Sequence, residues 1–268
     1  MTAAPIGIFD SGVGGLTVAR ALAHELPGES TLYFGDTARV PYGPKSPDVV
    51  RRYSLEILRW LVGQGVKVVV VACNTSSAHA LDLLREESPV PVFGVIEPGA
   101  RAVVKVDPFH PIGVIGTSGT IRSGAYQRAI QALLPDAEVV TKACPLFVPL
   151  VEEGWFNHPA SRVVAEEYLT PVRARNIRGL VLGCTHYPMI KPLIQEVMGD
   201  RVTLIDSAEE TARAVAAGLR ESGLTAPPGQ PVTHRFVVTD DPERFRRVGT
   251  GFLGERITDV EVLSPGTD

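Results

Sequence analysis

The sequence predicts an α/β fold made of two pseudo-symmetric α/β domains with mainly parallel sheets, and a ligand site in the cleft between them. The first observation is the run Val68–Val71, because four valines are typical of a strand buried on both faces of a parallel sheet. Cys73 follows, and then a helical pattern. The second is an apolar strand at 180–183 leading to Cys184, at an offset of 184 − 73 = 111 residues. The third is that strand, turn and helix occur in the same order in both halves.

Composition and charge restrict the class of protein. The chain has 268 residues, of which 44% are hydrophobic and 21% charged, as in an ordinary globular protein. Its formal net charge is −4 and it contains no basic run, so we expect no nucleic acid partner. The apolar runs are shorter than the ~20 residues that a membrane-spanning helix needs, so we expect no membrane partner.

The cysteines indicate a reducing compartment. The chain has three cysteines, no CxxC pair and no secretory signal at the N-terminus. We therefore expect a cytoplasmic location and no disulfide framework. A lone cysteine is usually a small buried hydrophobe, and we assign that role to Cys144, which precedes a proline and apolar residues. Cys73 and Cys184 differ from Cys144 because each lies at the end of a strand and before a helix, where open α/β sheets place their ligands.

In the first half, residues 6–9 form a predicted strand that leads through the turn from Asp10 to Leu16 into a helix. A glycine-rich turn before a helix suits an anion, yet Gly12-Val13-Gly14-Gly15 matches neither nucleotide-binding glycine motif. Asp10 would repel a phosphate, so a carboxylate ligand that also carries an ammonium group fits better. The alternative is a tight structural turn capped by Asp10 or Ser11.

The remaining elements of the first half follow the same pattern. A strand at 31–36 leads to a loop at 38–45 that is rich in proline and glycine and could wall a ligand site, and a helix at 49–62 follows. After the Cys73 strand and its helix come a strand at 90–96 and, at 97–99, an expected crossover into the second half.

The second half repeats the scheme, and its expected elements define the domains. We expect a first domain of residues 1–97 plus 207–268 and a second of residues 98–206. A glycine- and proline-rich loop or linker is expected at 222–231, and a frayed end at 264–268. The expected strands are 112–116, 137–141, 180–183, 202–207, 234–239 and 257–263, the expected helices are 126–134, 163–175, one after Pro188, and 208–220, and 144–154 is expected to be less regular.

Two thiols that converge on one ligand suit proton transfer at carbon. A zinc site needs more ligands than Cys184 and His186 provide, and acyl transfer would leave one cysteine without a role. Inversion at a Cα atom needs one group to remove the proton and another on the opposite face to supply one. The pattern therefore predicts a racemase or epimerase. Free cysteine has a pKa of ~8.5, and we expect the helix N-terminus to lower the pKa of Cys73.

The sequence resembles the cofactor-independent aspartate/glutamate racemase superfamily. The matching segments are GIFDSGVGGLTV, PYGPKS, ACNTSSA, GVIGTSGTI, PLFVPLVEEG and LGCTHYP, and they extend through most of the chain. The resemblance implies two α/β domains that face each other. It implies interconversion of L- and D-glutamate without pyridoxal phosphate or another cofactor, with no metal, and a supply of D-glutamate for peptidoglycan. It also implies glutamate as the small-molecule partner and a homodimer.

The resemblance also implies roles for individual residues. The two catalytic cysteines fall on Cys73 and Cys184, and the auxiliary acid–base positions fall on Asp10, His186 and Glu152. Besides Asp10 and His186, the substrate contacts fall on Ser11, Pro41, Tyr42, Gly43, Asn74, Thr75, Thr117, Thr120 and Thr185.

Three alternatives stay open at this point. A racemase for aspartate or another amino acid would share both thiols and differ in the room left for the side chain. Isomerases and decarboxylases also use this fold, but a decarboxylase needs only one protonating cysteine. A binding protein without turnover would use both cysteines for packing alone. Thiol alkylation separates the last case, since a binder with an open pocket should tolerate it.

Overall fold

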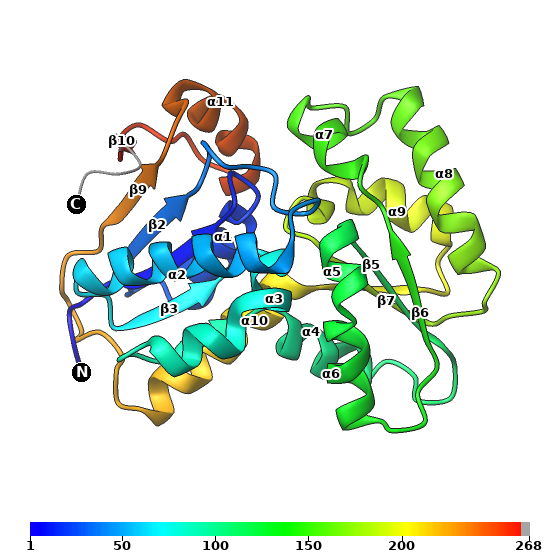
Figure 1. Cartoon of the computed structure of the whole chain (residues 1–268), viewed down its shortest axis with the longest axis horizontal. Helices are drawn as coiled ribbons and strands as arrows, with labels where there is room; N and C mark the ends of the chain where they lie inside the picture. The colour runs from blue at the N-terminus through cyan, green and yellow to red at the C-terminus, as the bar shows by residue number, and fades with distance from the viewer. Residues whose placement is uncertain (264–268) are drawn as a thin grey trace.

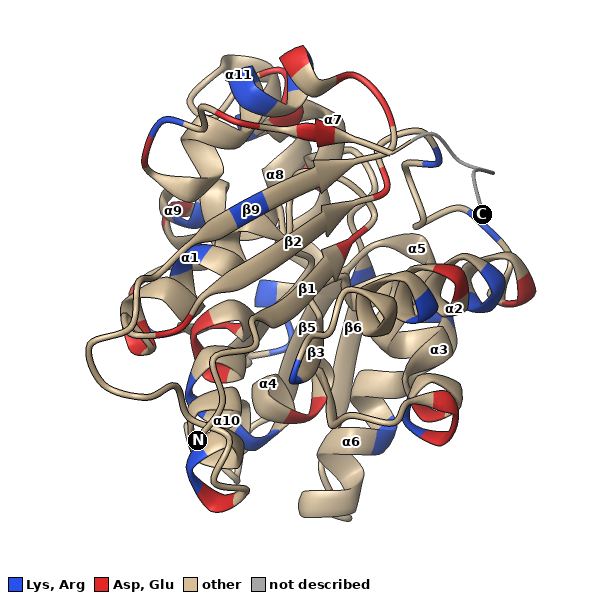
Figure 2. Cartoon of the chain, turned by 90° about the vertical axis from the view of Figure 1, so that its left-hand side faces the viewer, with Lys and Arg blue, Asp and Glu red and all other residues tan. Residues whose placement is uncertain are grey.

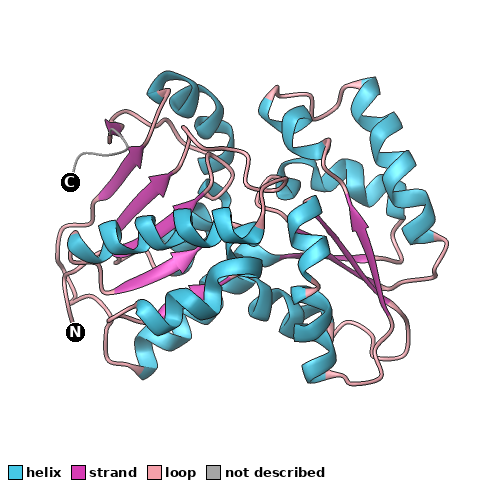
Figure 3. Cartoon of the chain, in the orientation of Figure 1, coloured by secondary structure: helices cyan, strands magenta, loops and turns pink. Residues whose placement is uncertain are grey.

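The computed structural model describes residues 1–263, which form two α/β lobes side by side (Figures 1 and 3). The frayed end expected at 264–268 lies outside the described residues. Each lobe is built on its own sheet, and all strand pairs within the two sheets are parallel. Helices cover the faces of both sheets, as parallel strands buried on both sides require.

The first lobe contains a six-stranded sheet in the order β10-β9-β2-β1-β3-β4. The central strands β1, β2 and β3 are buried along their whole length, which explains the uninterrupted apolar runs in the sequence. Its strands are β1 (Ile6–Asp10), β2 (Thr31–Gly35), β3 (Val68–Val71), β4 (Val92–Gly94), β9 (His234–Val238) and β10 (Glu261–Val262).

The second lobe contains a four-stranded sheet in the order β6-β5-β7-β8, which repeats the order β2-β1-β3-β4 of the first lobe. In each sheet the second strand is added on one side of the first strand and the third strand on the other side. The carboxyl ends of β3 and β7 therefore lie at equivalent topological switch points. Cys73 and Cys184 follow these two strands, and their equivalence is therefore a property of the topology. The strands are β5 (Ile112–Gly116), β6 (Val139–Ala143), β7 (Gly179–Gly183) and β8 (Thr203–Asp206).

The helices follow from apolar spacing and from caps. In α2 the residues Val50, Ile57, Leu58 and Leu61 are buried on one face, and the Ser46 hydroxyl accepts the amide of Val49 at the N-terminus. The helices of the first lobe are α1 (Leu16–Glu25), α2 (Pro47–Gly63), α3 (Asn74–Glu87), α10 (Ser207–Glu221) and α11 (Pro242–Leu253). Those between β4 and β8 are α4 (Ile96–Val103), α5 (Ser118–Ser123), α6 (Ala125–Leu133), α7 (Phe147–Glu152), α8 (Pro159–Arg173), the 3₁₀ helix η1 (Tyr187–Ile190) and α9 (Lys191–Met198).

The crossover expected at 97–99 is confirmed, since these residues belong to α4, a helix that connects the two sheets. Two other local expectations need correction. The segment expected to be irregular at 144–154 contains the helix α7. The strand expected at 257–263 is reduced to β10, which pairs with β9 over two residues only.

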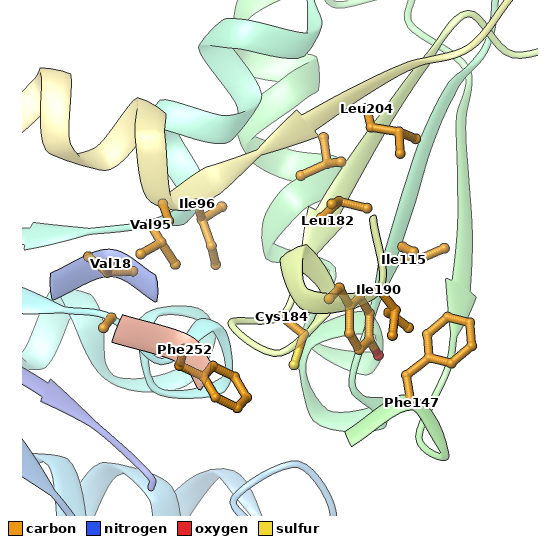
Figure 4. Close-up of a cluster of buried hydrophobic side chains, with 14 of the residues drawn as sticks. Val18, Val95, Ile96, Ile115, Phe147, Leu182, Cys184, Ile190, Leu204 and Phe252 are labelled. Carbon is orange, nitrogen blue, oxygen red and sulfur yellow. The ribbon is translucent and has the colours of Figure 1, made fainter. Parts of the chain in front are cut away.

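A shared core joins the lobes near α4 and α10. Val18 of α1, Val95 and Ile96 belong to the same buried cluster as Leu182 and Leu204 of the second sheet (Figure 4). The helix α10 follows β8 of the second sheet but packs on α1 of the first lobe. We propose on this basis that the domain boundaries lie near residues 97 and 207, as the sequence suggests.

The charged side chains lie mostly on helices and loops, and both signs are interspersed over the face shown in Figure 2. Among residues 1–263, no helix has the length and apolar character needed to span a membrane.

Candidate active site

Cys73 lies between β3 and α3, where its backbone is extended and its side chain caps the helix. The Ser76 amide donates to Sγ at 3.5 Å, and Sγ lies 3.8 Å from the Ser11 hydroxyl. Burial and the nearby Asp10 carboxylate raise the pKa of Cys73 to about 11. The helix N-terminus does lower this pKa through the Ser76 amide, as expected, but the net shift is upward. The amide contact does favour the thiolate, but desolvation of a thiol that is 5% exposed outweighs it.

Cys184 occupies the equivalent position after β7 and is equally buried. Its Sγ lies 3.9 Å from Nδ1 of His186, which directly precedes η1. The segment between β7 and η1, which carries Cys184, contacts the first lobe, since the Thr17 hydroxyl of α1 donates to the Thr185 carbonyl at 3.2 Å. Cys184 therefore lies where the two lobes touch.

His186 carries positive charge around neutral pH. Burial by itself would lower its pKa, but hydrogen bonds to Cys184 and Glu152 outweigh burial and raise the pKa of His186 to about 10. Its Nε2 atom lies 3.0 Å from Oε1 of Glu152. Burial opposes ionisation of Glu152, yet the hydrogen bond from His186 and the positive charge of Arg244 hold the pKa of this carboxyl below its usual range. The sulfur thus faces a protonated imidazole whose far side meets a carboxylate.

Asp10 ends β1 and is fully buried. Its Oδ2 accepts the Gly12 amide at 3.0 Å, whereas Oδ1 has no hydrogen-bond partner within residues 1–263. Burial raises the pKa of Asp10, and the positive charge of His186 only partly offsets this effect. A carboxyl of this kind can hold or release a proton near Cys73.

The side chains of both cysteines line one small cavity of about 30 Å³. Most of the residues expected from the sequence contribute to its wall. Asp10, Thr120 and Glu152 do not line it, although Thr120 and Glu152 contact residues that do. The lining residues are Ser11, Val40, Pro41, Tyr42, Gly43, Cys73, Asn74, Thr75, Thr117, Val148, Cys184, Thr185 and His186.

The loop carrying Tyr42 is fixed by Asp36, a buried residue that the sequence did not single out. The Tyr42 hydroxyl donates to Asp36, as do Arg39 Nε at 2.7 Å and the Thr239 hydroxyl at 3.0 Å. Since the proton of the Tyr42 hydroxyl is engaged in this way, this hydroxyl cannot also donate a hydrogen bond to a ligand.

Polar side chains gather next to Gly43 of this loop. The hydroxyls of Thr75, Thr117 and Thr120 are linked at 2.9, 3.0 and 3.4 Å. Asn74 accepts from Tyr126 at 2.7 Å through Oδ1, while its buried Nδ2 donor has no partner among the described residues. A buried donor without a partner is costly, so this atom is suited to a ligand carboxylate.

The raised pKa of His186 predicts a specific pH dependence of stability. In an unfolded chain a histidine has a pKa of ~6.5, so the folded value is the higher one. The stabilisation is complete below about pH 6.5 and is lost as the pH rises through about 10. We expect the urea midpoint of the wild type to fall more steeply over this range than that of His186→Asn. The exposed His24→Asn variant should follow the wild type. Parallel curves for the wild type and His186→Asn would contradict a protonated His186.

In the described part of the chain, no three His, Cys, Asp or Glu side chains gather in a way that could hold a metal ion.

Two lining residues, Val40 and Val148, carried no signal in the sequence because apolar residues of this kind occur throughout a core. Arg244, which contacts Glu152 at 3.0 Å, was also missed, because it lies in a different lobe and 92 residues away.

Comparison with known proteins places these features in a family. The family model described as Asp/Glu/Hydantoin racemase matches residues 15–215. The glutamate racemase of Geobacter metallireducens is 54% identical over 97% of this chain and 96% of its own length. Glutamate racemase isoform RacE1 of Bacillus anthracis superposes with a TM-score of 0.96 at 39% identity, and each chain is covered completely. The structure of the Francisella tularensis glutamate racemase in complex with D-glutamate superposes with a TM-score of 0.92 at 40% identity, with 98% of both chains covered.

Proposed function

Because the chain belongs to the Asp/Glu/Hydantoin racemase family, we propose that it interconverts L- and D-glutamate by two-base proton transfer between Cys73 and Cys184. The observation that carries the proposal is that these two thiols, one from each lobe, follow equivalent strands and line one cavity. Relatives at up to 54% identity over nearly the whole chain support glutamate as the substrate.

The proposed reaction has two proton transfers. One cysteine, as thiolate, removes the proton from the Cα atom, and the electron pair of the broken C–H bond spreads into the carboxylate. The opposite cysteine, as thiol, donates its proton to the other face of the planar carbon. The two sulfurs have then exchanged protonation states, so the enzyme is ready for the reverse direction. No electrons are lost or gained, and we propose that no cofactor is needed.

The polar groups around each sulfur fit these roles. A protonated His186 gives the Cys184 side a positive charge and a hydrogen-bond donor, held by Glu152. On the other side, Asp10 places a carboxyl of raised pKa near Cys73, where it can accept the proton of the thiol or of the substrate ammonium group. We propose that these three residues assist the cysteines and do not replace them.

Substrate recognition is proposed to use the unpartnered and hydroxyl groups of the cavity. The Nδ2 atom of Asn74 and the hydroxyls of Thr75 and Thr117 supply donors for carboxylate oxygens. We propose further contacts from Ser11, Thr185 and the loop 41–43. The cavity is small, about 30 Å³, and we propose that the lobes or this loop move apart when glutamate binds.

The purified chain with L-glutamate and no added cofactor tests the proposal. Optical rotation should decay to zero, since the two enantiomers are equally stable in water. A folded protein that leaves the rotation of L-glutamate unchanged but racemises L-aspartate would assign the aspartate alternative. Activity on neither amino acid would contradict the racemase proposal.

We further propose that the product is used for peptidoglycan, that the enzyme works in the cytoplasm and that it forms a homodimer. The family resemblance supports each of these statements. A bacterial strain that requires D-glutamate should grow without it when it expresses this chain, and continued dependence would contradict the cell-wall role. Light scattering on the purified protein measures the oligomeric state directly.

A further inference from the structure

The C-terminal helix α11 belongs to the first lobe but contacts the acid–base groups of the second. Arg244 Nη2 lies 3.0 Å from Oε2 of Glu152, and the other oxygen of Glu152 meets His186 Nε2, also at 3.0 Å. His186 in turn lies 3.9 Å from Cys184 Sγ. A continuous series of polar contacts therefore runs from the surface of α11 to the sulfur.

A second contact from α11 reaches the imidazole itself. The ring of Phe252, which is buried, packs edge-on against His186 with a centroid distance of 5.3 Å and an interplanar angle of 81°. Figure 4 shows Phe252 beside the loop that carries Cys184. The same helix thus contacts both partners of the His186–Glu152 pair.

Cys73 has a different kind of support. Its polar neighbours, Ser11, Ser76 and Asp10, all belong to the first lobe. The direct polar contacts of Cys73 come from one lobe, whereas the Cys184 side is completed only when α11 meets α7 across the cleft.

We propose that Arg244 is a positioning residue for Cys184 and not for Cys73. The proposal rests on the two-base function given above. Arg244 occupies Oε2 of Glu152, which fixes the carboxylate plane and directs Oε1 to His186. Its positive charge adds to the effect of His186 in lowering the pKa of that carboxyl and so favours the ionised form. Without Arg244, Glu152 is free to turn toward water, and His186 loses its fixed orientation beside the sulfur.

Racemisation alone cannot locate this effect. The equilibrium constant between enantiomers is one, so kcat/KM must stay equal in the two directions whichever cysteine is impaired. Elimination from β-chloroglutamate needs only one base. The Cα–H bond breaks, a Cα–Cβ double bond forms and chloride leaves with its electron pair. The enantiomer that Cys73→Ser still processes reports on Cys184, and the one that Cys184→Ser still processes reports on Cys73.

The experiment compares elimination from each β-chloroglutamate enantiomer by the wild type and Arg244→Gln. We expect kcat/KM to fall roughly tenfold for the enantiomer that reports on Cys184, the equivalent of one partly exposed charge-assisted hydrogen bond. The other enantiomer should react at the wild-type rate. Arg244→Lys should recover part of the loss, since it keeps the charge but not the planar donor geometry. The matched control is Arg247→Gln, an exposed arginine on the same helix, which should leave both rates unchanged.

Two results would overturn the inference, namely equal losses for both enantiomers or no loss for either in a folded Arg244→Gln variant. Equal losses would mean that Arg244 supports the fold as a whole, and urea unfolding of the same sample would show the accompanying destabilisation. If Arg244→Gln does not fold, the same comparison with Arg244→Lys decides the question. A wild type that does not racemise glutamate contradicts the proposed function instead, so the two failures are distinguishable.

Discussion

Replacing either Cys73 or Cys184 by serine is expected to lower glutamate racemisation by roughly 10²–10⁴-fold, the range usual for loss of a general acid or base. Serine is nearly isosteric with cysteine, so each variant should keep its fold. Its hydroxyl is a far poorer acid around neutral pH and cannot serve as the proton donor or acceptor. Since racemisation needs both faces of the Cα atom, one functional thiol cannot compensate for the loss of the other.

The measurement is the initial rate of change of optical rotation with L-glutamate, and separately with D-glutamate. The third cysteine is the matched control. Cys144 is fully buried and does not line the cavity, so Cys144→Ser should retain most of the activity. Appreciable racemisation by Cys73→Ser or Cys184→Ser would contradict the two-base proposal, because it would show that one thiol is sufficient.

Gly14→Ala is expected to lower kcat/KM by roughly 10²-fold, the effect of a misplacement of about 1 Å at a reacting centre. A Cβ atom at this position would lie 2.4 Å from the Thr185 hydroxyl and 2.5 Å from the imidazole of His186. The backbone of Gly14 is not left-handed, so alanine is compatible with the local chain. The clash falls between the lobes, and the loop bearing Cys184 must move to relieve it.

Kinetics and unfolding of Gly14→Ala separate this effect from general damage. The control is Gly28→Ala, where an added Cβ has no neighbour within 4 Å and activity should be unchanged. The urea midpoint of Gly14→Ala should stay close to that of the wild type, because the loop bearing Cys184 can shift without disturbing the core that the lobes share. Full activity of Gly14→Ala would contradict the requirement for close contact between Gly14 and His186.

The fold was predictable because its signals are local and repeated. Buried parallel strands produce uninterrupted apolar runs such as Val68–Val71, and the strand at Gly179–Gly183 produces a second. The small and polar residues that follow each run locate the switch points. Family motifs then identified most of the residues that line the cavity, with Cys73 and Cys184 among them.

Features that depend on tertiary contacts were not predictable. The helix N-terminus lowers the pKa of Cys73 as the sequence indicates, but the net shift is upward because of burial and of Asp10, which lies 63 positions earlier in the chain. Asp36 and Arg244 carry no distinguishing pattern in sequence. Their importance arises from partners that folding brings to them. Asp36 meets Tyr42 and Thr239, and Arg244 meets Glu152.

The most direct test of the two-base proposal is the position of deuterium when L-glutamate racemises in deuterated water. Early in the reaction, we expect D-glutamate to carry solvent deuterium at Cα, while the recovered L-glutamate keeps its original proton. This result follows because the acceptor thiol and the donor thiol are different groups on opposite faces. Deuterium in recovered L-glutamate at the same rate as in the product would mean that a single exchanging base serves both faces, and would contradict the account.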